Sequence, residues 1–379
     1  MRRTAAWAVL AFVVALALAL PGTALGQAEE GAAGAEGGDR ADGSDGYKAK
    51  LLGLPFVYYT PETKLAFGGG GVFNFRTGKK KETARTSSVW AFASYNLARQ
   101  FEVMIRPEIY LGGNDLYLFG DFRYERAPQR FYGVGDDMPT TDVESYTPRT
   151  FSVLLGAKKR LFRSLFAGFR CDFENVSIEA VEAGGILDEA GLTGSDGGVY
   201  SGLGLSLDWD SRDTVLFPHR GLFLELSADA FGDVLGSDAS FTSLAVDLRK
   251  YVPFGASRVL ALQARLHATG GDVPFHRLAL LGGESFLRGY YKGRFRDKGL
   301  LGVQAEYRVL VTERIGVVGF AGVAELFPGF DEFGIDNLKW SVGTGLRYMV
   351  NKRDGTTLRM DMAWGPACFG LYLTAKEAF

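Results

Sequence analysis

Hydrophobic and polar residues alternate along most of this chain, in runs of about ten residues. In one run, positions 301, 303, 305, 307 and 309 are apolar, and the positions between them are Gly302, Gln304, Glu306 and Arg308. Because successive side chains of a β-strand point to opposite faces, this pattern predicts strands with one apolar and one polar face. The same split recurs at 101–109, 222–230, 260–267 and 357–364. We therefore expect an all-β fold.

The runs predict about sixteen strands, an even number as is typical of single-chain bacterial barrels. A soluble β-sandwich shows the same period of two, so alternation alone does not separate the two folds. The runs are longer than typical sandwich strands, and the polar face carries charges of both signs, as the wall of a water-filled lumen would. We expect a transmembrane antiparallel β-barrel with strands at 53–60, 65–75, 87–97, 100–110, 115–126, 147–160, 164–178, 198–208, 221–231, 240–252, 257–270, 301–310, 314–325, 338–349, 356–364 and 368–378.

The first residues are typical of a secretory signal peptide. Arg2 and Arg3 precede an apolar run over 5–20, and the small residues Ala24 and Gly26 follow a helix breaker. An uncleaved anchor is the alternative, but the run is short for a bilayer span. We predict a signal peptide at 1–26, a disordered leader of Ala, Gly, Asp and Glu at 27–46, and the barrel at 47–379.

Charge and rare residue types exclude several function classes. The chain has 42 basic and 44 acidic residues, so it offers no basic footprint and we expect no nucleic-acid partner. Cys171 and Cys368 are too few for a disulfide scaffold and fit no zinc spacing, so we expect neither a metal nor a cofactor. His219, His267 and His276 accompany no nucleophile motif, so we expect no catalytic residues and no enzyme.

Three segments, in order along the chain, carry a family resemblance. The first reads Gly-Gly-Glu-Ser-Phe-Leu-Arg-Gly-Tyr over 282–290 and follows the eleventh expected strand; the second is a turn after the eighth strand, and the third is the last strand. Together they resemble the barrel domain of the Omp85 superfamily (BamA/TamA-like, surface antigen D15 domain) over residues 50–379. The matching residues are Gly282, Gly283, Leu287, Arg288, Gly289 and Tyr290 in the first segment, Asp210, Arg212, Asp213, Pro218 and Gly221 in the second, and Gly370, Tyr372 and Phe379 in the third.

The resemblance implies that the extracellular loop carrying Arg288 folds back into the lumen. A guanidinium held there needs an acidic partner, because an unpaired buried charge costs several kcal/mol. In the family that partner is an Asp of an F-x-D-x-G motif on the thirteenth strand, where this chain has Gly322. We expect Glu306 or Asp361 to replace it, with Glu325 as a third choice whose facing is less favourable. The alternative is that Arg288 contacts only backbone carbonyls or water.

The junction between the first and last strands is expected to be weak. Pro55 lacks the N–H that a ladder needs, and with Gly370 opposite it predicts a short seam, similar to the lateral gate of the family. The alternative is that Pro55 simply begins its strand.

Omp85 proteins insert or translocate polypeptides, usually with periplasmic POTRA domains. Only about twenty residues separate the expected signal peptide from the barrel, so we expect no POTRA domains. Either a separate periplasmic partner replaces them, or the barrel has another role, such as the passage of lipids or small solutes. The resemblance also implies residence in the bacterial outer membrane, contact with its lipids, and insertion by the barrel assembly machinery. The alternative function is a passive or plugged pore or structural barrel without insertase activity.

Overall fold

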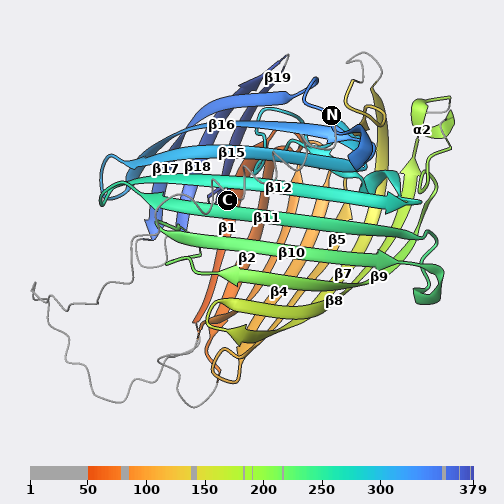
Figure 1. The fold of residues 1–379 in the computed structure, drawn as a ribbon. Coiled ribbons are helices and arrows are strands. Elements are labelled where there is room, and N and C mark those ends of the chain that lie inside the picture. Colours follow the sequence, from red (N-terminus) through yellow and green to blue (C-terminus); the bar gives the residue numbers. More distant parts are fainter. Residues whose placement is uncertain are drawn as a thin grey trace, which may run out of the picture.

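The computed structural model is a closed antiparallel β-barrel (Figure 1). It describes residues 50–77, 85–137, 143–181, 184–189, 191–215, 217–351, 356–366, 368–375 and 377–379; the expected signal peptide and leader lie outside these ranges. Within them, sixteen strands form the wall. They are β1 (Lys50–Thr60), β2 (Lys64–Phe75), β3 (Ser87–Asn96), β4 (Phe101–Leu111), β5 (Leu116–Arg126), β7 (Glu144–Phe162), β8 (Leu165–Ala180), β9 (Gly197–Asp210), β10 (Gly221–Phe231), β11 (Phe241–Pro253), β12 (Arg258–Gly271), β15 (Gly299–Leu310), β16 (Ile315–Phe327), β17 (Lys339–Asn351), β18 (Thr356–Gly365) and β19 (Cys368–Ala375).

Each wall strand pairs with the next along the chain, and β19 returns to β1. The barrel prediction is confirmed, and the expected strands differ from the observed ones by only a few residues at their ends. The short elements were not predicted: β6 (Gln129–Phe131), β13 (Ala279–Leu281), β14 (Phe295–Asp297), the helix α2 (Ile186–Glu189) and the 3₁₀ turns η1 (Asp233–Leu235), η2 (Phe275–Arg277) and η3 (Phe330–Glu332). In the described part of the chain, no helix is long and apolar enough to cross a bilayer.

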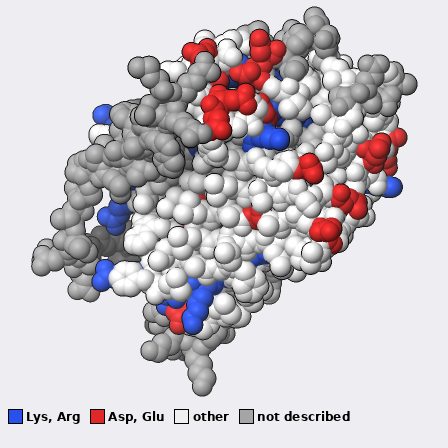
Figure 2. All heavy atoms as spheres, turned by 45° about the vertical axis from the view of Figure 1, so that its right-hand side comes forward, with Lys and Arg blue, Asp and Glu red and all other residues white. Residues whose placement is uncertain are grey.

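The two faces of the wall differ as the alternation predicts. On β15, the inward side chains of Gln304 and Arg308 are 6% and 3% exposed, whereas the outward Tyr307 is 41% exposed. The middle of the face shown in Figure 2 is almost entirely uncharged, and charged side chains gather toward its ends. An outward Arg or Lys at the bilayer midplane costs about 2–4 kcal/mol, which explains the uncharged band.

The two ends of the barrel carry different connections. We call one the long-loop end, because the connections 127–143, 181–196, 272–298 and 328–338 lie there, and the other the short-turn end. At the long-loop end, buried aromatic and aliphatic side chains of β6, β7, α2 and η2 pack together: Phe131, Tyr146, Leu187 and Phe275. Loops distant in sequence thus form a common cap.

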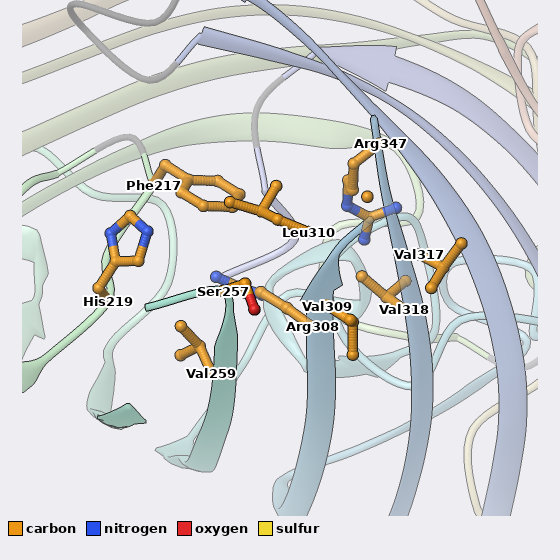
Figure 3. A pocket seen from close by; sticks show the side chains of 11 residues that line it. Phe217, His219, Ser257, Val259, Arg308, Val309, Leu310, Val317, Val318 and Arg347 are labelled. Carbon is orange, nitrogen blue, oxygen red and sulfur yellow. The ribbon is translucent and has the colours of Figure 1, made fainter. Parts of the chain in front are cut away.

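At the short-turn end, the connection between β9 and β10 folds against the mouth of the barrel. The ring of Phe217 is buried and lines a pocket together with Leu310 and the inward Arg347, whereas His219 lies at the side of this pocket (Figure 3). The turn between β9 and β10 therefore lies against inward-facing residues of β15 and β17 at the short-turn end.

The last residues depart from the sequence prediction. The closing strand was expected to continue to 378, but β19 ends at Ala375, and Phe379 packs in the lumen against Tyr251, Val259 and Ala261. The guanidinium of Arg308 lies 5.5 Å from the Phe379 ring centroid and donates a hydrogen bond to its main-chain oxygen at 3.0 Å. An inward aromatic cluster, rather than pairing in the wall, holds this residue.

Candidate functional site

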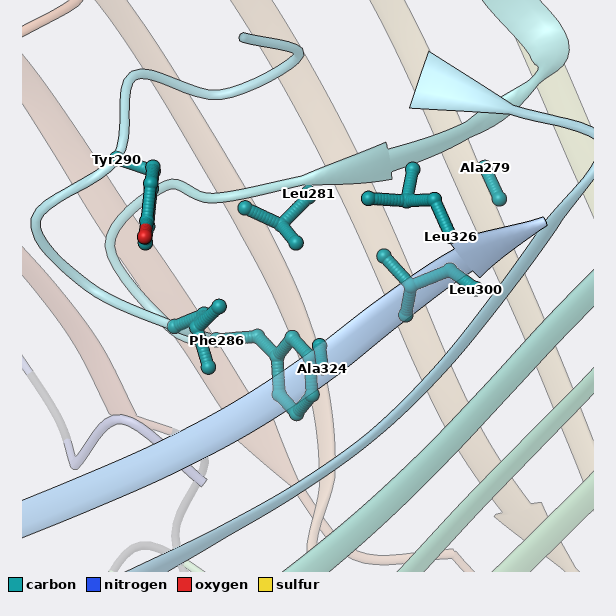
Figure 4. Close-up of a cluster of buried hydrophobic side chains, with 8 residues drawn as sticks. Ala279, Leu281, Phe286, Tyr290, Leu300, Ala324 and Leu326 are labelled. Carbon is teal, nitrogen blue, oxygen red and sulfur yellow. The ribbon is translucent and has the colours of Figure 1, made fainter. Parts of the chain in front are cut away.

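The connection between β12 and β15, which we call the inserted loop (272–298), lies inside the barrel. Its strands β13 and β14 pair with each other as a small hairpin apart from the wall. Apolar side chains of the loop pack on the inner face of β15 and β16, as Figure 4 shows. This cluster contains Ala279, Leu281, Phe286, Leu287, Tyr290, Leu300, Ala324 and Leu326. Burial of its own apolar face therefore holds the loop in place.

The Gly-Gly-x-x-x-Leu-Arg-Gly-Tyr segment forms the tip of this loop. Gly282 has a φ of +99°, and a Cβ there would lie 2.7 Å from the carbonyl oxygen of Tyr290, so a side chain does not fit. Leu287 has a φ of 48°, which is unfavourable for a branched residue. This turn presents the next residue, Arg288, to the barrel wall.

Arg288 is fully buried and binds two carboxylates. Its Nη1 donates to Asp361 Oδ2 at 2.5 Å, and its Nη2 donates to Glu306 Oε2 at 2.6 Å. The guanidinium also stacks on the ring of Phe320, 3.5 Å from its centroid. Glu306 lies on β15 and Asp361 on β18, so Arg288 connects the loop to two separate strands. Charge-assisted hydrogen bonds of this kind are stronger than hydrogen bonds between neutral groups.

The pair of carboxylates belongs to a larger buried network. Arg347 donates to Asp361 Oδ1 at 2.5 Å and to Glu377 Oε2 at 2.8 Å. Arg308 donates to Glu306 Oε1 at 2.7 Å, and Arg359 lies 3.6 Å from Asp361. Each carboxylate is shared between guanidiniums, which offsets the cost of removing these charges from water.

Glu325, the third expected partner, lies apart from this network. Its side chain is buried near the long-loop end of β16, and its Oε2 makes no hydrogen bond within the described residues. Odd positions of β16 point away from the lumen, as the exposed Val317 and Val323 show, so Glu325 does not share the inward face with Glu306. Its orientation separates it from Arg288.

The seam between β1 and β19 has one paired position in the described residues, Tyr59 with Leu373. By contrast, β1 pairs with β2 from Lys50 to Thr60. Counting from the single pair in this antiparallel register, Pro55 is level with residue 377 and Gly370 is level with residue 62. The prediction that Gly370 lies opposite Pro55 is therefore wrong, because the two strands are staggered.

The inserted loop contacts both sides of this seam. The backbone N–H of Gly289 donates to the hydroxyl of Tyr372 on β19 at 2.9 Å. The backbone N–H of Lys292 donates to Glu62 Oε1, in the turn after β1, at 2.7 Å. Tyr372, expected in the seam and the C-terminal signal, lies on β19, and its buried side chain points inward. The loop therefore bridges two strands that pair at one position within the described residues.

Tyr290 anchors the loop on a third strand. Its hydroxyl donates to the carbonyl oxygen of Trp340 on β17 at 3.2 Å, and its ring is buried among the loop residues. Burial raises the pKa of the Tyr290 phenol to about 12, so it stays protonated at neutral pH. The phenol is an uncharged anchor beside the charged network.

The turn motif after β9 has a local structural role. Arg212 donates to both carboxylate oxygens of Asp210, and Asp213 Oδ1 accepts the backbone N–H of His219 at 3.0 Å. Pro218 is buried next to this turn, and at Gly221, with a φ of +115°, a Cβ would lie 2.4 Å from the carbonyl oxygen of Ser211. The motif therefore shapes the turn that carries Phe217 to the barrel mouth.

Two sets of polar contacts in the lumen were not predicted from the sequence. Arg277 on η2 donates to Asp172 and, at 2.6 Å, to Glu174, which ties the outer part of the inserted loop to β8. Ser243 Oγ and His267 Nε2 lie 3.1 Å apart. The strand residues among them face inward as alternation predicts, but only the closed barrel shows which inward groups contact each other.

A model of the Omp85 superfamily domain matches residues 146–364, more than half of the chain. The solved structure of BamA from Haemophilus ducreyi lacking POTRA domains 1-3 is similar, with a TM-score of 0.60 and 14% identity over 86% of this chain and 70% of that one. No curated protein sequence matches the chain.

Two further barrels are similar. CdiB from Acinetobacter baumannii has a TM-score of 0.54 and 11% identity, over 86% of this chain and 59% of that one. CdiB from Escherichia coli has a TM-score of 0.56 and 10% identity, over 86% of this chain and 62% of that one. This chain thus spans less than two thirds of both CdiB chains, and at these identities the likeness shows the fold alone.

Proposed function

Since this chain belongs to the Omp85 superfamily, we propose that it resides in the bacterial outer membrane and assists the insertion or translocation of polypeptides through the junction of β1 and β19. The observation that carries the proposal is the seam itself, where the described residues contribute one paired position, Tyr59 with Leu373. An unpaired strand edge offers free N–H and C=O groups to another chain. A client strand could add to this edge by the same backbone pairing.

Contacts of the inserted loop with β19 and with the turn after β1 would control the opening of the junction. The loop's contacts with Tyr372 on one side and with Glu62 on the other bridge the seam from the inside. The Arg288 network anchors the same loop to β15 and to β18, the strand next to β19. Opening would therefore break these two hydrogen bonds while the ion pairs of Arg288 stay in place.

The short-turn end would face the periplasm, where a separate protein would deliver clients. The outward apolar band would contact outer-membrane lipids, and the barrel assembly machinery would insert the barrel itself.

Crosslinking the seam tests the proposal. In a background with Cys171→Ser and Cys368→Ser, Tyr59→Cys and Leu373→Cys place two thiols at the paired position, within disulfide reach. The readout is the rate at which an unfolded outer-membrane β-barrel protein folds into vesicles that contain this protein. Oxidation is expected to slow this rate several-fold, and reduction to restore it.

A matched control places the disulfide across a fully paired junction. Phe67 and Tyr95 are paired on β2 and β3, and both face outward. Oxidation of Phe67→Cys with Tyr95→Cys should leave the rate unchanged. An unchanged rate with a fully oxidised seam would overturn the proposal.

The alternative is a plugged barrel without insertase activity. Anchoring of the inserted loop by Arg277 and Arg288 favours it, because these contacts keep the lumen filled. In that case the vesicles would not accelerate client folding at all, while deletion of 279–297 would open a steady ion-conducting pore.

A further inference from the structure

Two arginines face outward where β5, β7 and β8 reach the long-loop end. Arg126 Nε donates to Glu179 Oε2 at 2.6 Å, and Arg149 Nη1 lies 3.4 Å from Glu179 Oε1. Arg126 and Arg149 stand on the outer face of the wall, since Tyr124 and Phe151, two residues away on the same strands, are exposed there. Glu179 on β8 contacts both guanidiniums. Two guanidiniums thus share one carboxylate, and the group keeps a net positive charge.

Aromatic rings lie directly below this group and mark its depth. Tyr124 pairs with Phe151 across β5 and β7, and its ring lies 6.3 Å from that of Phe101. Phe151 in turn lies 6.4 Å from Phe173. Aromatic girdles of membrane barrels mark the boundary between acyl chains and headgroups. Two residues along a strand span about 7 Å, which puts the guanidiniums among the headgroups.

The arginines have donors to spare. Arg126 and Arg149 side chains are 46% and 49% exposed, and the contacts with Glu179 use only part of the five N–H donors that each guanidinium carries. At the interface an outward arginine costs only about 0–1 kcal/mol, so the position is tolerated without a ligand. The free donors point into the layer where lipid phosphates lie.

We propose that Arg126 and Arg149 bind the phosphate group of an anionic membrane lipid on the outer surface of the barrel. Guanidinium and phosphate match in shape and charge, and two arginines side by side provide a fork for one phosphate. Tyr124, Phe151 and Phe173 would contact the upper part of the acyl chains. Glu179 holds the two guanidiniums together and weakens the site by its negative charge. This site lies on the outer wall, apart from the seam and the inserted loop. It rests on the outer-membrane location in the proposed function, but not on polypeptide insertion or translocation.

Native mass spectrometry of the full chain tests the proposal. The protein is released from micelles that contain bisphosphorylated lipid A, or the same lipid with both phosphates removed. The wild type is expected to retain the phosphorylated lipid and several-fold less of the dephosphorylated one. Arg126→Gln with Arg149→Gln should lower retention of the phosphorylated lipid several-fold, while lysines at both positions should keep part of it.

Two further variants separate lipid binding from a structural ion pair. Glu179→Gln should raise retention, because it removes the competing carboxylate, whereas a merely structural triad predicts no gain. Arg258→Gln, exposed at the short-turn end, is the matched control and should change nothing. The proposal is overturned if the phosphorylated and dephosphorylated lipids are retained equally, or if Glu179→Gln lowers retention as the arginine variants do.

Discussion

The side chain of Leu287 fills the space in front of Gly322, since a Cβ built on Gly322 would lie 3.0 Å from Leu287 Cδ1. The related family pattern has Asp at this position of the thirteenth wall strand. Here an apolar side chain of the inserted loop takes that space, and the carboxylates of Glu306 and Asp361 bind Arg288 from other strands. Glycine in place of Asp at position 322 therefore leaves the space that the side chain of Leu287 fills.

Restoring the family residue is therefore expected to harm this protein. Gly322→Asp would also bring a Cβ to 2.9 Å from that of Gln304, and overpacking of this kind costs about 1–3 kcal/mol. Urea unfolding in lipid vesicles, followed by tryptophan fluorescence, measures the loss. Adding Leu287→Ala should recover part of it, so the double variant should be more stable than the sum of the single effects predicts. Additive effects would show that the two residues do not compete for space.

Removing the guanidinium of Arg288 should cost about 3–5 kcal/mol of unfolding free energy, because it leaves Glu306 and Asp361 short of a buried partner. Double-mutant cycles of Arg288→Gln with Glu306→Gln and with Asp361→Asn are expected to give coupling energies above about 1 kcal/mol for both pairs. The partly exposed pair Arg123–Glu102, 3.5 Å apart, is the control and should couple by less than this. A zero coupling for either carboxylate would remove it from the set of partners.

Tyr372→Phe should loosen the tip of the inserted loop. The change leaves the buried N–H of Gly289 without its acceptor, which costs about 1–3 kcal/mol. Hydrogen exchange read by mass spectrometry should become faster over 282–292 and stay unchanged over β8. Tyr348→Phe, an outward tyrosine, is the control and should leave exchange as it is in the wild type. Equal protection in Tyr372→Phe and wild type would contradict the bridging role of the hydroxyl.

Arg277→Gln should release the outer part of the inserted loop, because it removes hydrogen bonds to Asp172 and Glu174. Single-channel recording in planar bilayers is expected to show more frequent conducting openings than in the wild type. The exposed Arg258 at the short-turn end provides the control, and its change to Gln should leave the recordings unaltered. If openings are as rare as in the wild type, other contacts hold the loop.

Strand positions could be predicted because they follow from a local rule. On β15, each inward polar residue is flanked by outward apolar ones, since lipid contacts one face and the lumen the other. The same rule indicates that Glu306 and Asp361 point inward and that Glu325 does not. The candidate partners of Arg288 were therefore readable from alternation before any contact was known.

The contacts themselves could not be read in this way. Alternation does not reveal that Arg277 meets Asp172 and Glu174, or that Ser243 meets His267, because these residues come from different strands or loops. Nor does it show that the chain leaves the wall after Ala375 and that Phe379 packs inside, since an apolar residue suits the lipid face equally well.

The number of strands, their two faces and the position of the loop that carries Arg288 follow from local sequence, because each depends on neighbours a few residues apart and on the medium that each face contacts. The stagger of β1 against β19, the two carboxylates that share Arg288 and the bridge of the inserted loop across the seam arise only in the folded barrel. The reason is that closing the barrel brings together residues remote in the chain, such as Gly289 with Tyr372 and Glu62 with Lys292.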